Sequence, residues 1–359
     1  MEKIMNSSVS QILIFTLIIL FNSCSKGDKV IVYDAPEGEI RSEDYRVWVN
    51  GKEVFCYEGR VYDTRFTEGK FFGENGLPYS TVTFGYFDFS GQVEVKVEVK
   101  NQHEPDSAVV RPLSAKVEPD IEENTILFKL TKPGSFTIEP NGSEKRVLHL
   151  FANPMMKRPD LEDENMIYYG PGKHVVNTIK LKDNQTLFVD GGAVLYFDAF
   201  ENDTVYRIET RNNGEIRLKR YDHGIEAVNA KNIKIKGRGI LDFSKIAEKN
   251  GRKNPIHINN CENIEVEGII MRDANCWHAT FYRSKDILID NIKEIAWGFN
   301  SDGINIVLSQ NVHIKNCFMR QRDDGIVMKS MDTGNTDAFI IEVQQAITST
   351  SDVLVEDCV

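Results

Sequence analysis

Hydrophobic and polar residues alternate over much of the first half of the chain. Between residues 41 and 150 the alternation has a period of two, as in residues 45–49 and 93–99. This period buries one face of a β-strand and leaves the other face in water. Turn sequences such as Asn141-Gly142 separate the runs,. The pattern predicts an antiparallel β-sandwich of immunoglobulin-like type over residues 41–150, which we expect to be an accessory domain.

A short strand motif recurs in the rest of the chain. Each copy begins with Asn or Asp, has two inward β-branched residues and ends with Gly, Asn or Asp; the copies span residues 232–237, 263–268, 286–291, 311–316 and 352–357. Their starts are 31, 23, 25 and 41 residues apart. One strand per repeat without helical periodicity is typical of a solenoid whose coils bury their inner faces by stacking. Over residues 151–359 the sequence therefore predicts a right-handed parallel β-helix.

The predicted fold is all-β, with the β-sandwich followed by the right-handed parallel β-helix. If the coils stack in register, the residues after each corner form one column, made of Ile269, Ile292, Cys317 and Cys358. We therefore expect Cys317 and Cys358 to be buried column residues without a catalytic role. The sequence ends at Val359, directly after a corner and without a capping element. We expect the β-helix to be incomplete at its C-terminus, because a bare coil exposes unpaired backbone groups.

The first residues have the pattern of an export signal. An apolar run between positions 12 and 21 follows Lys3. At roughly ten residues it is too short to cross a hydrocarbon core about 30 Å thick. Ser23-Cys24 closes the run and resembles a bacterial lipoprotein processing site, in which the cysteine is lipidated. We expect a lipoprotein signal peptide over residues 1–23 and a polar tether over residues 24–40, with an ordinary signal peptide as the alternative.

The composition is that of a soluble globular protein. The 359 residues are 41% hydrophobic and 27% charged, and the formal net charge is −11,. An acidic chain without a basic run indicates no nucleic-acid partner, although a few basic residues can still make a local groove for an anionic substrate. The five cysteines that follow Cys24 contain no CxxC pair, so we expect neither a zinc site nor any other metal or cofactor,.

These features predict a monomer that touches the membrane only through a lipid on Cys24. The expected location is the bacterial outer membrane or the cell surface. Without the lipid, the protein would be periplasmic or secreted.

Candidate chemistry lies where the repeats carry carboxylates. Asp302 and the pair Asp323-Asp324 are about 21 residues apart, close to one coil. We expect Asp302 and Asp323 at matching positions on neighbouring coils, with three carboxylates within a few ångströms. Like charges at that separation raise one pKa, which gives the protonated acid and ionised partner that glycosidic bond hydrolysis needs. A cation site or a cluster of turn-capping aspartates is the alternative.

Over about residues 165–359 the chain resembles the polygalacturonases of glycoside hydrolase family 28. That family has Asn-Thr-Asp and Gly-Asp-Asp motifs about one coil apart, and here they read Asn300-Ser301-Asp302 and Arg322-Asp323-Asp324. The segments 237–242, 276–278 and 326–330 are also similar. The resemblance implies an inverting hydrolase in which Asp323 protonates the leaving oxygen. Asp302 and Asp324 would activate the attacking water.

The expected substrate is a pectin-type, galacturonan-like polysaccharide. We expect Asn300, Lys329, Trp277 and Trp297 to bind it. For the two tryptophans, packing between coils is the alternative to stacking on sugar faces. The Gly-His-Gly and Arg-x-Lys motifs of the family, of which the second binds the substrate carboxylate, do not follow the aspartates in this sequence.

Other functions stay open. A β-sandwich joined to a β-helix also resembles glycoside hydrolase family 49, the dextranases and isopullulanases, which use three aspartates on neutral α-glucan. A non-catalytic surface lipoprotein that binds glycans is a second alternative. A polysaccharide lyase is less well supported, because it would need calcium ligands and a basic residue, for which Lys329 is the nearby candidate.

Overall fold

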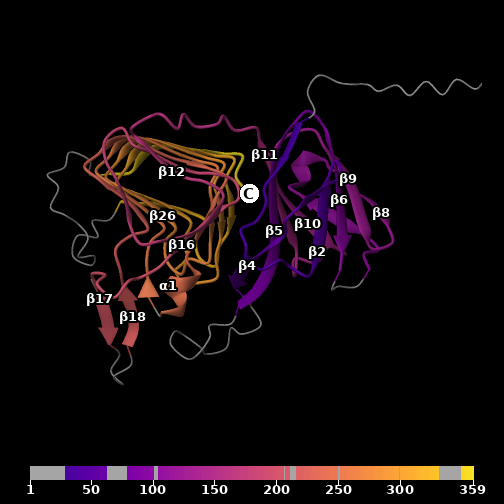
Figure 1. Ribbon diagram of the computed structural model, residues 1–359, viewed down its shortest axis with the longest axis horizontal. Coiled ribbons are helices and arrows are strands. Elements are labelled where there is room, and N and C mark those ends of the chain that lie inside the picture. The colour runs from indigo at the N-terminus through magenta and orange to yellow at the C-terminus, as the bar shows by residue number, and fades with distance from the viewer. Residues whose placement is uncertain are drawn as a thin grey trace, which may run out of the picture.

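The computed structural model describes residues 29–62, 79–100, 104–205, 207–210, 216–249, 251–298, 300–330 and 349–359. In these ranges the protein is nearly all-β, with two antiparallel-type sheets followed by a parallel β-helix, which confirms the predicted fold class. Figure 1 shows the two parts side by side. No helix in the described ranges is long and apolar enough to cross a membrane. The expected signal peptide and Cys24 lie outside the described residues.

The N-terminal part is a sandwich of two sheets. One has the order β1 (Lys29–Val32), β5 (Tyr79–Ser90), β11 (Leu148–Pro154), β10 (Gly134–Pro140) and β7 (Ala108–Arg111), with β4 (Tyr57–Tyr62) also on β5. Its pairs are antiparallel except β5 with β11. The second sheet is antiparallel, with the order β3 (Lys52–Val54), β2 (Tyr45–Val49), β6 (Val93–Val99), β9 (Thr125–Leu130) and β8 (Asp120–Glu122). A 3-10 helix, η2 (Leu113–Ala115), follows β7.

The sandwich extends beyond the expected limits of 41 and 150. We expected residues 24–40 to be a polar tether, but β1 lies within that segment. Val30 and Val32 pair with Phe89 and Phe87 of β5 and pack on the sandwich core, which gives this short segment a half-buried face. At the other end, β11 runs to Pro154. The β-helix therefore begins after this strand and not at residue 151.

The β-helix has three parallel sheets, each receiving one strand from successive coils. The first sheet has the order β12 (Met166–Tyr169), β15 (Thr186–Val189), β20 (Lys231–Gly237), β24 (Glu262–Glu267), β27 (Lys285–Asp290), β30 (Gln310–Lys315) and β33 (Ser351–Glu356). The second sheet has the order β13 (Gly172–Val176), β16 (Ala193–Phe197), β21 (Ile240–Asp242), β25 (Ile270–Arg272), β28 (Lys293–Ile295) and β31 (Phe318–Arg320). The third sheet has the order β14 (Ile179–Leu181), β19 (Ile225–Val228), β23 (Ile256–Asn259), β26 (Ala279–Tyr282), β29 (Ile304–Val307) and β32 (Ile326–Lys329).

Each copy of the sequence motif is a strand of the first sheet. A small side sheet of β17 (Arg207–Thr210), β18 (Ile216–Arg220) and β22 (Gly251–Arg252) lies beside the coils, with the short helix α1 (Ser244–Glu248) (Figure 1).

Both ends of each motif have left-handed backbone. The last residues have positive φ, as expected for the corners: Gly237, Gly268, Asn291, Asn316 and Asp357. The first residues also have φ between 54° and 59°: Asn232, Asn263, Asp286, Asn311 and Asp352. Asparagine and aspartate tolerate this conformation better than other non-glycine residues. The motif therefore begins with Asn or Asp for the same conformational reason that it ends with Gly, Asn or Asp.

The first residues of the motif also form a ladder of side-chain hydrogen bonds between coils. Asn232 Nδ2 donates to Asn184 Oδ1 at 2.7 Å, Asn263 Nδ2 donates to Asn232 Oδ1 at 2.7 Å, and Asn311 Nδ2 donates to Asp286 Oδ1 at 2.6 Å. The ladder fixes the register of neighbouring coils at the edge of the first sheet.

We predict that Asn263→Ala lowers the free energy of unfolding by about 1–2 kcal/mol, because alanine is strained at positive φ and cannot form the ladder bond. Asn263→Gly is the matched control: it relieves the strain and loses only the hydrogen bond, so its effect should be smaller. Urea denaturation of the two variants measures the loss from the missing hydrogen bond and the additional loss from backbone strain. Equal losses for alanine and glycine would contradict the conformational part of this explanation.

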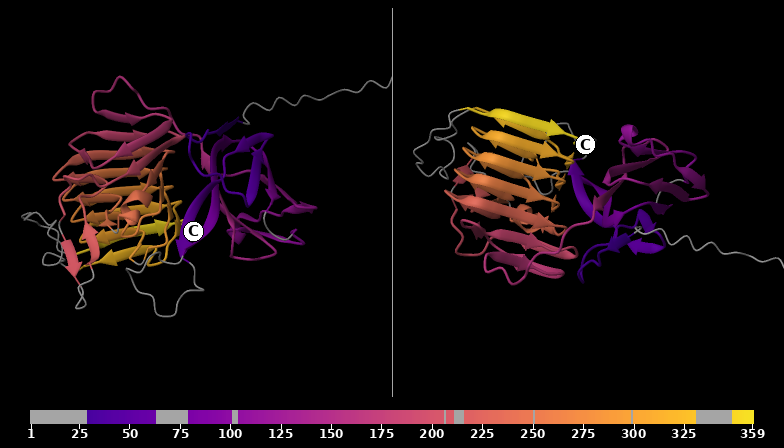
Figure 2. Two further views of the ribbon diagram at one scale, coloured as in Figure 1. Left: turned by 60° about the horizontal axis from the view of Figure 1, so that its bottom comes forward. Right: turned by 90° about the horizontal axis from the view of Figure 1, so that it is seen from above.

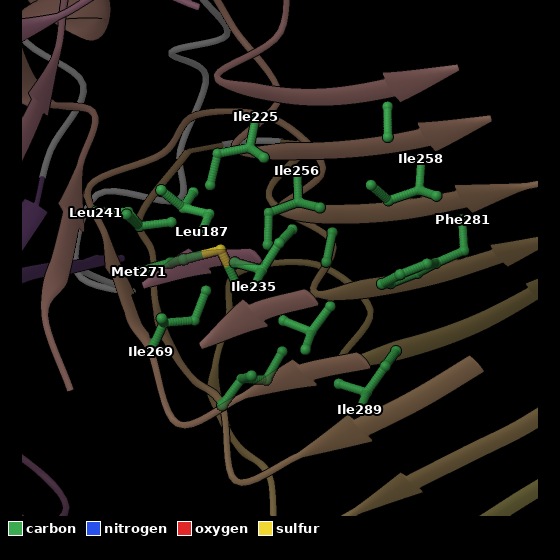
Figure 3. Close-up of a cluster of buried hydrophobic side chains, with 14 of the residues drawn as sticks. Leu187, Ile225, Ile235, Leu241, Ile256, Ile258, Ile269, Met271, Phe281 and Ile289 are labelled. Atoms are coloured by element: carbon green, nitrogen blue, oxygen red, sulfur yellow. The ribbon is translucent and has the colours of Figure 1, made fainter. Parts of the chain in front are cut away.

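Apolar side chains from all three sheets fill the interior of the β-helix. Ile235, Leu241, Ile258 and Phe281 point into one cluster (Figure 3). Cys317 is fully buried in this core, as predicted, whereas Cys358 is half-buried and packs on its edge.

The sandwich packs against the outer face of the second sheet. Figure 2 shows it beside the stack of coils. Tyr57, Phe84 and Phe151 of the sandwich share an apolar cluster with residues of β21, β25, β28 and β31. Beside this cluster, Arg238 Nε and Asp88 Oδ1 form an ion pair at 2.8 Å in which both side chains are almost completely buried. The two parts are therefore joined by both apolar packing and a buried charge pair.

Candidate active site

The three candidate aspartates lie just before neighbouring strands of the third sheet. Asp302 precedes β29, and Asp323 and Asp324 precede β32. Ile304 pairs with Ile326, so the coil is 22 residues long at this point. The backbone N–H of Gly303 donates to the carbonyl oxygen of Asp324 at 2.8 Å. Asp302 is therefore in register with Asp324, and the expected match with Asp323 is displaced by one residue.

The three carboxyl groups differ in their exposure. Asp302 is 5% exposed, whereas Asp323 and Asp324 are exposed. Burial raises the pKa of Asp302, the nearby Lys329 opposes this shift, and the charge of Asp323 adds to it. The expected rise of one pKa thus falls on Asp302. Its largest cause is burial, and repulsion by Asp323 contributes less.

Lys329 lies beside Asp302 at the end of β32. Its Nζ donates to Asp302 Oδ2 at 3.0 Å and to Asn305 Oδ1 at 2.7 Å, and it lies 3.5 Å from the centre of the Trp277 ring. Four side chains from three coils therefore meet at this point. The sequence analysis did not select Asn305, although a polar residue between two inward isoleucines of β29 is a recognisable signal of a side chain that points out of the core.

The other two expected substrate-binding residues have different surroundings. Asn300 Oδ1 accepts a hydrogen bond from Arg252 Nη2 at 2.9 Å, which ties the turn before Asp302 to β22. Trp297 is 8% exposed and packs against the sandwich, with its ring 5.6 Å from that of Tyr79 and 5.3 Å from the guanidinium of Arg60. This placement corrects the expectation that Trp297 faces substrate, because the residue follows β28, whose outer face the sandwich covers.

A buried histidine supports the backbone at Asp302. His278 Nδ1 lies 3.3 Å from the carbonyl oxygen of Asp302, and burial lowers the pKa of His278 to about 4. The ring is therefore neutral near pH 7. Within the described residues, no group of three His, Cys, Asp or Glu side chains is placed to hold a metal ion. A buried carboxyl with a raised pKa beside two exposed carboxyls is suited to acid–base chemistry.

Comparison with known proteins identifies the family of this region. Residues 193–347 match the family model described as glycosyl hydrolases family 28. No curated protein is significantly similar to the chain. Three solved structures illustrate its structural similarities. Dex49A from Penicillium minioluteum is 13% identical, with 91% of this chain and 72% of that chain covered and a TM-score of 0.48.

The family 28 exopolygalacturonase of Yersinia enterocolitica is 12% identical, with 92% and 67% covered and a TM-score of 0.42. A hyperthermoactive exopolygalacturonase from Thermotoga maritima is 20% identical, with 54% and 51% covered and a TM-score of 0.42. The matched segment contains Trp277, Asn300, all three candidate aspartates and Lys329. Residues 193–347 thus match glycoside hydrolase family 28, the family that the aspartate motifs resemble.

Proposed function

We propose that the protein is an inverting glycoside hydrolase that cleaves a pectin-type, galacturonan-like polysaccharide. The observation that carries the proposal is the convergence of Asp302, Asp323 and Asp324 from two neighbouring coils of a family 28 domain. Inversion needs one carboxyl as general acid and another, roughly 6.5–9.5 Å away, as base for a water molecule.

The surroundings of the aspartates support separate roles. Asp302 accepts a charge-assisted hydrogen bond from Lys329, which favours its ionised form, while burial makes it a stronger base than an ordinary carboxylate,. Asp323 is exposed, so its carboxyl group can reach the leaving oxygen of a polysaccharide bound on this face. In this mechanism Asp323 protonates the leaving oxygen, and Asp302 and Asp324 activate the water.

The groups around these carboxyls offer contacts for a sugar chain. Trp277 is half-buried beside Lys329 and offers part of a ring face. Asn300, on the turn before Asp302, and Arg252 of β22 provide polar contacts. We propose that a uronic acid unit binds across these residues.

Replacing Lys329 should change the pH dependence of hydrolysis. The ammonium lowers the pKa of Asp302, so Lys329→Met should raise that pKa, and the ionised base should appear only at higher pH. The acidic limb of the profile of kcat/KM against pH is therefore expected to move to higher pH. Lys315→Met is the matched control, because Lys315 pairs with Asp290 on the first sheet, away from the third. An unchanged acidic limb in Lys329→Met would contradict the role of Asp302 as base.

Release of reducing ends from polygalacturonate, dextran and pullulan tests the substrate class. We expect release from polygalacturonate and not from the two glucans. The reverse result would favour a neutral α-glucan, the alternative suggested by the sandwich beside the β-helix. Binding of any of these chains without release, by wild type as well as by Asp323→Asn, would favour a non-catalytic glycan-binding protein.

We also propose that Cys24 carries a lipid that anchors the protein at the bacterial outer membrane or cell surface. The support is the apolar run and Ser23-Cys24 in the sequence,. Labelled palmitate should enter the wild-type protein in a bacterial host and should not enter Cys24→Ala. Recovery of unlabelled wild-type protein in the soluble fraction would contradict the anchor.

A further inference from the structure

A glutamate lies inside the β-helix where its neighbours are apolar. Glu294 is in the middle of β28 and pairs in register with Met271 of β25 and Met319 of β31; Leu241 occupies the same row on β21. Leu241 and Met271 point into the interior cluster (Figure 3). Residues in register on parallel strands share a face, so the Glu294 side chain also points inward. It is completely buried.

The carboxyl group of Glu294 contacts both turns that carry the candidate aspartates. Glu294 Oε2 accepts a hydrogen bond from Gln321 Nε2 at 2.8 Å, and Gln321 lies two residues before Asp323. The same oxygen lies against Gly303, the residue after Asp302, so closely that a Cβ atom at this position would collide with it. Glycine at position 303 therefore makes room both for this carboxyl and for the backbone carbonyl oxygen of Gly325.

The contact leaves one oxygen unpaired on each partner. Among the described residues, neither Glu294 Oε1 nor Gln321 Oε1 has a hydrogen-bond partner, and both atoms are buried. Two buried acceptors without a donor are unfavourable unless one of the groups carries a proton. A carboxylic acid and a primary amide can form a cyclic pair in which the acid O–H donates to the amide oxygen. A proton on Glu294 would thus satisfy both remaining oxygens.

The electrostatic surroundings also favour the uncharged acid. Met271 and Met319 flank Glu294 in its row, and burial raises the pKa of Glu294 to about 8, against the smaller effect of the hydrogen bond from Gln321. Cys317, at the corner, is a titratable neighbour of Glu294. Its hydrogen bond to Cys358 and its burial raise the pKa of the Cys317 thiol, so it stays neutral.

We propose that Glu294 is a positioning residue: as an uncharged acid inside the β-helix, it holds the turns that carry Asp302 and Asp323 in a fixed relation through Gly303 and Gln321. We call the contacts of Glu294 with Gly303 and Gln321 the clamp. Its existence does not depend on what the aspartates do, whereas its effect on turnover rests on the proposed hydrolase function. A shift of one turn against the other by about 1 Å would cost roughly 100-fold in rate.

Two measurements without substrate test the clamp. In wild type, the backbone amide of Gly303 and the side-chain amide of Gln321 should shift together in NMR spectra with a midpoint near pH 8, and this transition should be absent in Glu294→Gln. The melting temperature of wild type relative to Glu294→Gln should be highest in acid. This difference in melting temperature should decrease as the pH rises from the ordinary pKa of glutamate to pH 8. Over this range the unfolded chain has already released the Glu294 proton, while the folded protein still holds it,.

Glu201→Gln, at an exposed position, is the control and should melt in parallel with wild type across that range. The same pH dependence in wild type and Glu294→Gln, or amides that do not titrate near pH 8, would overturn the proposal.

Activity on polygalacturonate tests the positioning role. Glu294→Gln keeps the shape and the paired amide, so it should retain wild-type kcat at pH 6 and lose the alkaline decline near pH 8. Glu294→Leu fits the apolar row but leaves the Gln321 amide unpaired, and its kcat should fall about 100-fold with KM nearly unchanged. Equal kcat in wild type and a folded Glu294→Leu would overturn the positioning role. If wild type hydrolyses no polysaccharide, the proposed function fails, and the NMR and melting results still decide whether the clamp exists.

Discussion

An Asp323→Asn variant is expected to lose turnover by about 10²–10⁴-fold while it keeps its fold and its affinity for polysaccharide. The amide has nearly the same shape as the acid but cannot deliver a proton to the leaving oxygen. The loss therefore belongs in kcat rather than in KM. Asp323 is exposed, so the substitution removes no buried contact on which stability depends,.

The control variants for Asp323 separate catalysis from structure. Asp160→Asn changes an exposed aspartate in the segment before the first coil and should leave turnover unchanged. Asp302→Asn and Asp324→Asn should also be severe. Combining either with Asp323→Asn should add little, because the three groups act as a unit. A cluster of turn-capping aspartates predicts the opposite pattern, with lower melting temperatures and normal turnover in the molecules that stay folded.

The second large effect concerns the buried ion pair between the sandwich and the β-helix. Arg238→Met should lower the free energy of unfolding by about 3–5 kcal/mol, because it leaves Asp88 charged and buried without its partner,. Arg238 Nη2 also donates to the carbonyl oxygen of Pro154 at 2.8 Å, and this bond is lost in the same variant. Chemical denaturation followed by fluorescence measures the change.

Two further variants show that the effect comes from the unpaired charge. Lys129→Met breaks an ion pair with Glu94 in which both side chains are exposed, at 62% and 71%, and it should cost less than about 1 kcal/mol,. The double variant Arg238→Met with Asp88→Leu removes both buried charges and should recover much of the stability. Equal losses in Arg238→Met and Lys129→Met would contradict the role of burial.

The sequence predicted the coils because each carries a local signature. The segment 263–268 shows two inward β-branched residues between two positions that need left-handed backbone, and the structure has this pattern in β24. The strands β12 and β15 lack the signature, so the beginning of the β-helix could not be located from the repeat. β1 is short, and only its pairing with β5 shows that it belongs to the sandwich.

The candidate site could be predicted where outward residues occupy equivalent positions on neighbouring coils, as Asp302, Asp324 and Lys329 do. The placement of residues that face the sandwich could not be predicted in this way. In β28, Lys293, Glu294 and Ile295 are all completely buried, because the sandwich covers the outer face while the core takes the inner face. In such a strand, the alternation of hydrophobic and polar residues does not show which side chains point into the β-helix. The inward direction of Glu294 and the packing of Trp297 on Tyr79 therefore required the tertiary structure.

The stereochemistry of hydrolysis tests the central claim most directly. Polygalacturonate is incubated with wild-type protein, and proton NMR spectra recorded in the first minutes follow the anomeric signals of the new reducing ends before they mutarotate. The proposed mechanism predicts that the first product has the anomeric configuration opposite to that of the cleaved bond, and that Asp323→Asn gives no such signal. A first product with retained configuration, or equal release by wild type and Asp323→Asn, would contradict the mechanism.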